Sequence, residues 1–83
     1  MNIYLISEYV KRMTKQDIVK FSTSQGITLE EQELDTIYNY VKKYYKTFIY
    51  GNPRPILDEL KTKVKPMTYN KIENLYGQFK YKI

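Results

Sequence analysis

The chain has 83 residues, which is enough for one domain at most, because two hydrophobic cores need more residues than this. It contains no cysteine and no histidine, which excludes disulfides, zinc and iron–sulfur sites, thiolate nucleophiles and imidazole bases. The net charge of +5 is uneven, with four basic and six acidic residues in 1–41 but ten basic and three acidic residues in 42–83. Any attraction for an anionic partner is therefore expected in the second half.

The first predicted element is a helix over about residues 2–12. Ile6 and Val10 lie on one apolar stripe of this helix, and Leu5 and Tyr9 widen the stripe. The start of the chain has no basic segment before an apolar run and no small-residue cleavage site, so a secretory signal is not expected.

A second helix is predicted from about Lys15 to Ser24. Thr14 and Asp17 have the spacing of a capping box, in which each side chain accepts a hydrogen bond from the other residue's backbone amide. Gly26 ends the helix, because glycine adopts the left-handed conformation without a Cβ penalty. The apolar stripe of this helix consists of Ile18 and Phe21.

A long third helix is predicted to begin at Leu29, because Thr28 and Glu31 repeat the capping-box spacing. It ends in the segment 50–53, which contains a glycine and an Asn-Pro pair. Its apolar residues fall within an arc of about 120° and are predicted to face the core. They are Leu34, Ile37, Tyr38, Val41, Tyr44, Tyr45 and Phe48.

Two short helices complete the chain. The fourth is predicted to have Asn52 as its N-cap and Pro53 at its first position, and to run to about Lys63 or Lys65. Pro66 ends it, since the residue before a proline avoids the helical region. The fifth helix is predicted to begin after Thr68.

These elements predict an all-α fold, a compact bundle of about five short helices that forms a single helical domain over residues 1–83. No sustained alternation of apolar and polar residues indicates a strand. No uncharged apolar stretch approaches 18 residues, so no membrane-spanning helix is expected, and a cytoplasmic location is favoured.

An ordered set of motifs runs from Met13 to Phe79: Met-Thr-x-x-Asp-Ile-x-x-Phe, Gly-Ile-Thr-Leu, a long helix, Asn-Pro-Arg-x-x-Leu, and Met-Thr-x-x-x-Ile-x-x-Leu-Tyr-x-x-Phe. In this order the chain resembles an uncharacterised family of short all-helical proteins, a domain of unknown function, from Gram-positive bacilli. The resemblance implies an all-helical fold and a bacterial cytoplasmic location. It implies no activity and no functional residues. The tyrosine-rich stretch of the third helix departs from the family pattern.

Catalysis is not expected, so the chain is predicted not to be an enzyme and to need no cofactor, metal or small-molecule substrate. Adjacent carboxylates such as Asp58 and Glu59 point to different sides of a helix and do not form a shared acid–base site. Three isolated glycines cannot form a phosphate-binding loop. DNA reading by the third helix is also rejected, because the acidic residues in its first turns would repel phosphates.

The segment from Tyr38 to Tyr50 interleaves tyrosines with lysines and is the main candidate for a binding surface. Tyr40 and Tyr50 lie away from the apolar arc and are predicted to be exposed. The candidate interaction surface consists of Tyr40, Lys43, Lys46, Tyr50 and Arg54.

Thirteen aromatic residues exceed what so small an interior hides, which favours a surface for another protein. The sequence therefore predicts a small basic protein that acts as a non-catalytic protein–protein interaction or adaptor module, with another protein or a second copy of itself as partner. The alternative is nonspecific binding of single-stranded nucleic acid through the basic, tyrosine-rich second half. In that case Lys42, Lys43 and Lys46 would neutralise phosphates.

Overall fold

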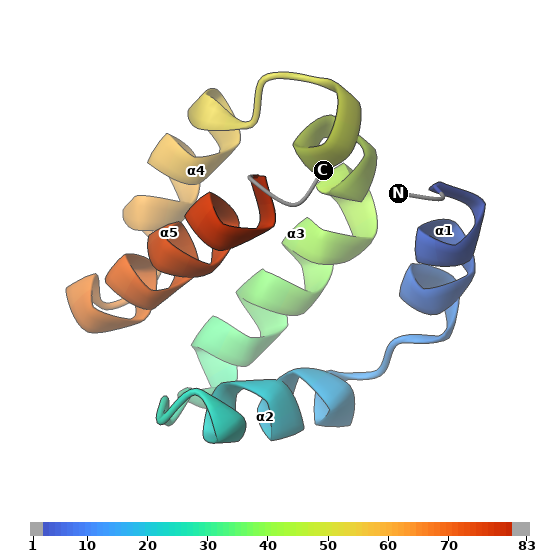
Figure 1. Cartoon of the computed structure of the whole chain (residues 1–83). Helices are drawn as coiled ribbons and strands as arrows, with labels where there is room; N and C mark the ends of the chain where they lie inside the picture. Colours follow the sequence, from blue (N-terminus) through green and yellow to red (C-terminus); the bar gives the residue numbers. More distant parts are fainter. Residues whose placement is uncertain (1–2, 81–83) are drawn as a thin grey trace. The chain divides into compact units, whose positions relative to one another are not determined.

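The computed structural model describes residues 3–80, apart from the side chains of residues 3, 79 and 80. Five helices follow one another along this part of the chain (Figure 1). They are α1 (Ile3–Arg12), α2 (Lys15–Ser24), α3 (Glu31–Tyr50), α4 (Arg54–Lys61) and α5 (Pro66–Lys80). Residues 3–80 contain no strand, so the predicted all-α class with five helices is confirmed.

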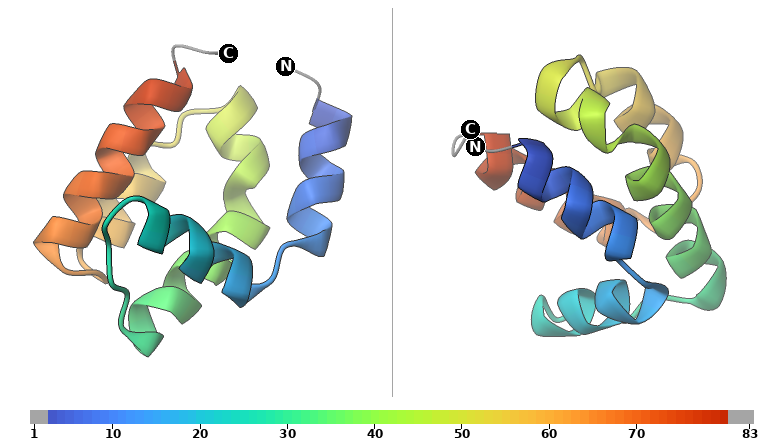
Figure 2. Two further views of the ribbon diagram at one scale, coloured as in Figure 1. Left: turned by 60° about the horizontal axis from the view of Figure 1, so that its bottom comes forward. Right: turned by 90° about the vertical axis from the view of Figure 1, so that its right-hand side faces the viewer.

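The helices group into two compact units, residues 1–45 and 46–83, and the boundary falls within α3. The first unit contains α1, α2 and most of α3. The second contains the end of α3 together with α4 and α5, which lie side by side and run in opposite directions (Figures 1 and 2). The single domain over residues 1–83 stays a prediction.

Local signals set both ends of α2, as the sequence predicts. The backbone amide of Thr14 donates to Asp17 Oδ2 at 2.9 Å, and the amide of Asp17 donates to Thr14 Oγ1 at 3.2 Å. Gly26 follows the helix with a φ of 75°, in the left-handed region that favours glycine. The predicted capping box and glycine stop are therefore confirmed.

The start of α3 differs from the prediction, because the helix begins at Glu31 and not at Leu29. The cap lies two residues after Thr28, where the amide of Glu30 donates to Glu33 Oε1 at 3.2 Å. The side chain of Glu33 is buried, which holds its carboxylate at the free amides of the helix start.

The helices of the second unit also differ from the prediction at their starts. Helix α4 begins at Arg54, with Pro53 at the cap position in place of Asn52. The side chain of Asn52 nevertheless accepts a hydrogen bond from the amide of Arg54 at 3.1 Å. Helix α5 begins at Pro66, which needs no amide partner at a first helical position, and the predicted cap Thr68 is buried inside the first turn.

The buried apolar side chains are few and belong to both units. Among the described residues they are Val10, Met13, Ile18, Leu57, Leu60 and Tyr69. The predicted apolar arc of α3 is half-buried along its whole length. Three residues placed on apolar stripes by the sequence, Leu5, Tyr9 and Phe21, are exposed instead, because a neighbouring helix covers only part of a wide stripe.

Candidate interaction surfaces

One face of α1 is held against α3 within the first unit. The hydroxyl of Tyr45 donates to Ser7 Oγ at 3.0 Å. The ammonium of Lys42 donates to the carbonyl of Val10 at 2.5 Å and to that of Lys11 at 3.0 Å. Lysine near a helix C-terminus satisfies carbonyls that have no partner inside the helix and suits the negative end of its dipole. Together these contacts decide which side of α1 faces α3.

Three large apolar side chains of α1 are highly exposed. Tyr4 is 70% exposed, Leu5 65% and Tyr9 63%. Leu5 and Tyr9 are four residues apart, so their side chains are neighbours on the helix surface. Leu5 and Tyr9 form the α1 outer face, and the exposed Tyr4 lies about 100° further around the helix from Leu5. Adjoining exposed apolar side chains are typical of surfaces that bind another molecule.

Two lysines of the first unit, Lys15 and Lys42, make contacts within that unit. Lys42 lies 5.4 Å from the ring centre of Tyr38, and Lys15 lies 5.7 Å from the same ring. Lys15 also forms an ion pair with Asp35 at 2.7 Å. The hydrogen bond and charge of Asp35 raise the pKa of Lys15. Lys42, one of the three lysines of the nucleic-acid hypothesis, therefore has a structural role.

The sequence-predicted surface is divided between the two units. In the first unit, Tyr40 and Lys43 come together on the ring of Tyr44. The rings of Tyr40 and Tyr44 meet edge to face, with centres 5.5 Å apart, and the Lys43 ammonium lies 5.1 Å from the Tyr44 ring centre. Lys43 is exposed, but Tyr40 is only half-exposed, so the sequence overestimates the exposure of Tyr40.

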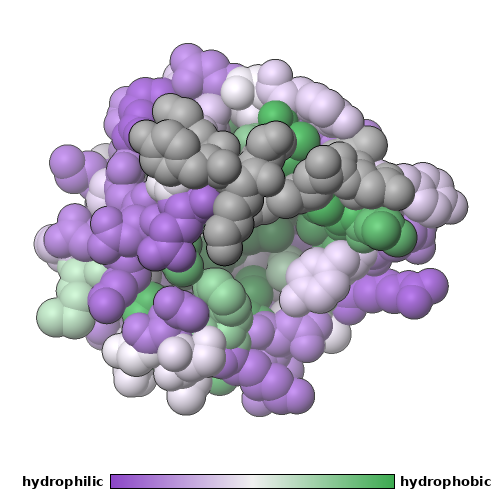
Figure 3. Space-filling model, in the orientation of Figure 1, coloured by the Kyte–Doolittle hydropathy of each residue, from purple (hydrophilic) through white to green (hydrophobic). Residues whose placement is uncertain are grey.

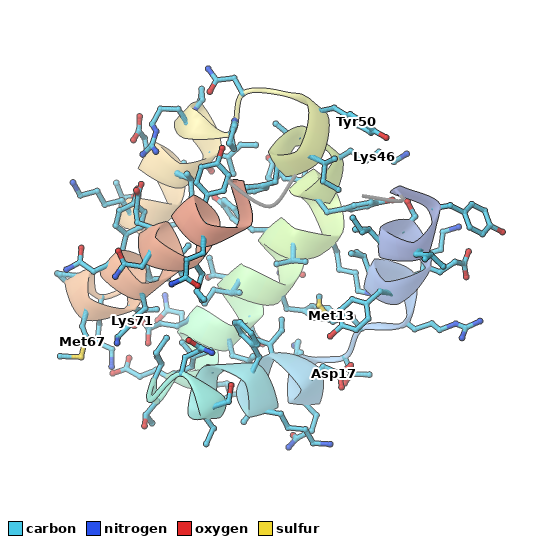
Figure 4. The ribbon with its side chains drawn as sticks, viewed as in Figure 1. Met13, Asp17, Lys46, Tyr50, Met67 and Lys71 are labelled. Carbon is cyan, nitrogen blue, oxygen red and sulfur yellow. The ribbon has the colours of Figure 1, made fainter. Side chains whose placement is uncertain are left out.

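In the second unit, Lys46 and Tyr50 lie one turn apart near the end of α3. Tyr50 is 70% exposed, as predicted, and Figure 4 shows both side chains projecting from the same end of the helix. Tyr50 and Lys46 are thus exposed as an aromatic and a cationic group on neighbouring turns.

Arg54, the last residue of the predicted surface, joins α4 to α5. Its guanidinium contacts Glu73 Oε1 at 2.5 Å, and the hydroxyl of Tyr69 donates to the same oxygen at 2.5 Å. The hydrogen bonds from Arg54 and Tyr69 lower the pKa of Glu73. Burial and the contact with Glu73 raise the pKa of Tyr69, so the phenol stays protonated. Arg54 therefore contributes to packing within the unit.

The described residues offer no group of three or more acidic, histidine or cysteine side chains that could hold a metal ion. Among the helices of residues 3–80, none is long and apolar enough to cross a membrane. No protein-family model, curated protein or solved structure matches this chain. The resemblance to short helical proteins of Gram-positive bacilli stays a prediction that rests on its motifs.

The α1 outer face is the surface that sequence reasoning missed. A signal for it exists, because the apolar residues of α1 other than Tyr4 cover about 160° of the helix circumference at 100° per residue, and one neighbouring helix covers less than this. The sequence does not show which part of the arc stays uncovered. That depends on the contacts that Ser7 and Val10 make with α3.

Proposed function

We propose that this protein is a non-catalytic interaction module that binds another protein, or a second copy of itself, through the α1 outer face. The observation that carries the proposal is the high exposure of Leu5 and Tyr9 on a helix whose other side is already held against α3. Following the family resemblance, we place this activity in a bacterial cytoplasm.

The chemistry of the α1 outer face suits a protein partner. Burying one large apolar side chain at an interface contributes about 1.5–3 kcal/mol, and tyrosine adds a hydroxyl that stays hydrated or bonds to the partner. Glu8 and Arg12 border the face, and the Glu8 carboxylate lies 3.9 Å from Arg12 and 3.8 Å from Lys11. Such exposed ion pairs contribute little internally, so these charges remain available to orient a partner.

The proposal is tested by site-specific photo-crosslinking in cells that produce the full chain. A benzophenone amino acid replaces one tyrosine at a time, at Tyr9 for the α1 outer face, at Tyr4 for the adjoining side of α1, and at Tyr40 or Tyr50 for the sequence-predicted surface. All four variants substitute an aromatic for an aromatic, so each serves as a control for the others. Adducts are identified by mass spectrometry.

We expect a discrete adduct from Tyr9 that disappears when Leu5→Ser is added. The same adduct should persist when Phe21→Ser is added, since Phe21 is also exposed but lies on α2. Adducts from Tyr50 alone would move the interface to the sequence-predicted surface. The absence of a discrete adduct at all four positions would refute the interaction module.

Nucleic-acid binding remains the second candidate function, because exposed Lys46 and Tyr50 lie on neighbouring turns of α3. A ring that stacks on a base beside a lysine that meets a phosphate is the arrangement used for single strands. Anisotropy of a labelled single-stranded oligonucleotide tests it at about 50 mM and about 200 mM salt, since phosphate contacts weaken steeply over that range. Lys46→Gln should weaken such binding, whereas Lys20→Gln should not.

A further inference from the structure

A second surface lies at the connection between α4 and α5 and has a composition of its own. Between Leu60 and Ile72 the chain has four lysines and no acidic residue. All four are exposed, and they lie at the end of α4, in the connection and in the first turns of α5. Glu59, at the border of this segment, lies 3.9 Å from Lys63. The four residues are Lys61, Lys63, Lys65 and Lys71.

An apolar side chain projects from the middle of this basic segment. Met67 is 75% exposed, more than any other large apolar residue among those described. Lys71 lies four residues further along α5, on the same face of the helix, and Figure 4 shows the two side chains at the same end of α5. Figure 3 shows hydrophilic side chains around a small hydrophobic area at this end of the hairpin. Met67 and the four lysines are called the basic turn below.

The basic turn is supported by a well-packed hairpin. Leu57 and Leu60 of α4 are buried, and so are Thr68 and Tyr69, the two residues that follow Met67 in the chain. The ammonium of Lys61 lies 5.8 Å from the ring centre of Tyr69. A side chain presented from a supported turn loses little conformational freedom when it enters another phase.

We propose that the basic turn docks on an anionic lipid surface, with Met67 entering the interface and the lysines contacting headgroup phosphates. Lysine stems lie along apolar surface while their ammonium groups reach the headgroups, which suits exposed lysines on either side of one apolar residue in the chain. Nucleic acid fits this surface less well, because Tyr69 is the only aromatic residue in the segment and it is buried. This contact is separate from the α1 outer face and does not depend on the proposed function.

The expected strength follows from the number of charges. Each lysine beside an anionic membrane raises the partition coefficient about fivefold, so four raise it by several hundredfold. Entry of Met67 adds about a further tenfold, for a side chain that is only partly inserted. The result is a reversible contact that salt weakens, since the charges are exposed.

The test is co-sedimentation of the full chain with vesicles of phosphatidylcholine containing 30% phosphatidylglycerol, at about 50 mM and about 200 mM salt. Vesicles of phosphatidylcholine alone are the neutral control. The pair Lys63→Gln with Lys65→Gln should lower the partition coefficient about 25-fold. The matched pair Lys11→Gln with Lys20→Gln removes the same charge from α1 and α2 and should change it less than about threefold.

A separate experiment measures the insertion of the Met67 side chain into the lipid. The chain contains no cysteine, so Met67→Cys gives a single site for an environment-sensitive fluorophore, and Leu5→Cys gives a control site on the α1 outer face. On addition of anionic vesicles we expect a blue shift from position 67 and none from position 5.

Three results would overturn the proposal. The first is the absence of binding to anionic vesicles at either salt concentration. The second is an equal loss from both glutamine pairs, which would indicate a net-charge effect with no particular site. The third is an oligonucleotide or an acidic peptide that binds in a manner sensitive to Lys63→Gln with Lys65→Gln while vesicles do not bind. In that case the basic turn recognises a polyanion and not a lipid surface.

Discussion

Lys42 provides a direct measure of how α1 is attached to α3, and Lys42→Met is the change that isolates it. Methionine keeps most of the aliphatic stem but removes the ammonium group that bonds to the carbonyls of Val10 and Lys11. The hydrogen bond to Val10 is partly buried and counts for about 1.5 kcal/mol as a bond to a charged group. The bond to Lys11 is exposed, so solvent screening reduces it to about 0.5 kcal/mol.

The free energy of unfolding should therefore fall by about 2 kcal/mol in Lys42→Met. This is a large share of the total for a chain of this size, which we place at about 4–12 kcal/mol. Urea denaturation followed by circular dichroism measures the loss as a lower midpoint, by about 1.5–2 M for a slope near 1 kcal/mol per M. Lys20→Met, at an exposed position of α2, is the matched control and should change the midpoint little.

Hydrogen exchange locates the effect along the chain. In Lys42→Met the amides of α1 should exchange faster, whereas the amides of α4 and α5 should keep their protection. A loss no greater than that of Lys20→Met would show that Lys42 does not hold the end of α1. Only the hydrogen bond between Tyr45 and Ser7 would then remain as evidence for which side of α1 faces α3.

Three further predictions concern stability. Because the pKa of Glu73 is lowered in the fold, the stability that its carboxylate contributes should be fully present above an unfolded pKa of about 4.3 and lost as the pH falls through the folded pKa. The difference in urea midpoint between the parent chain and Glu73→Gln should therefore become smaller from pH 7 to pH 3, and a larger difference at pH 3 would contradict this prediction. Thr14→Ala should lower the free energy of unfolding by about 1 kcal/mol through loss of the capping box, and Thr23→Ala, inside the same helix, should lower it much less. Equal thermal midpoints for these two variants would show that the capping box does not stabilise the helix. Gly26→Ala should lower the free energy of unfolding by about 1 kcal/mol because Gly26 has a positive φ, whereas Gly77→Ala, with open space for a Cβ inside α5, should raise it by about 0.5–1 kcal/mol. A change of the free energy of unfolding in the same direction for both variants would be inconsistent with these backbone conformations.

Much of the local structure can be predicted from the sequence, because its causes lie within a few residues. The capping box of Thr14 and Asp17 and the left-handed Gly26 depend on side chains and backbone in direct sequence neighbourhood. The number of helices follows for the same reason, since each helix is bounded by a proline, a glycine or a cap.

The starts of α3 and α5 could not be predicted in this way, because two acceptable starts lie within three residues of each other. Burial selects between them: Glu33 is buried at the start of α3, and Thr68 is buried inside the first turn of α5. Burial depends on tertiary packing, which a short pattern does not contain.

In the candidate surfaces, too, the features with causes close in the chain could be predicted, and those that depend on tertiary contacts could not. The exposure of Tyr50 follows from its place at the end of a long helix, and it is predicted correctly. The engagement of Lys42 could not be predicted, because its acceptors lie more than 30 residues away in the chain. The pairing of Arg54 with Glu73, 19 residues apart, depends on the α4–α5 hairpin in the same way. Residue type gives the chemistry of a side chain, but its partner decides whether the side chain is available.

The yield of the photo-crosslinked adduct from Tyr9, measured with and without Leu5→Ser, tests most directly whether the protein is an interaction module that binds through α1. We predict a discrete adduct from Tyr9, a large loss of that adduct in the Leu5→Ser variant, and little change in the Phe21→Ser variant. An adduct of equal yield in all three backgrounds, or no adduct from Tyr9 at all, would contradict the assignment of the α1 outer face as the binding surface.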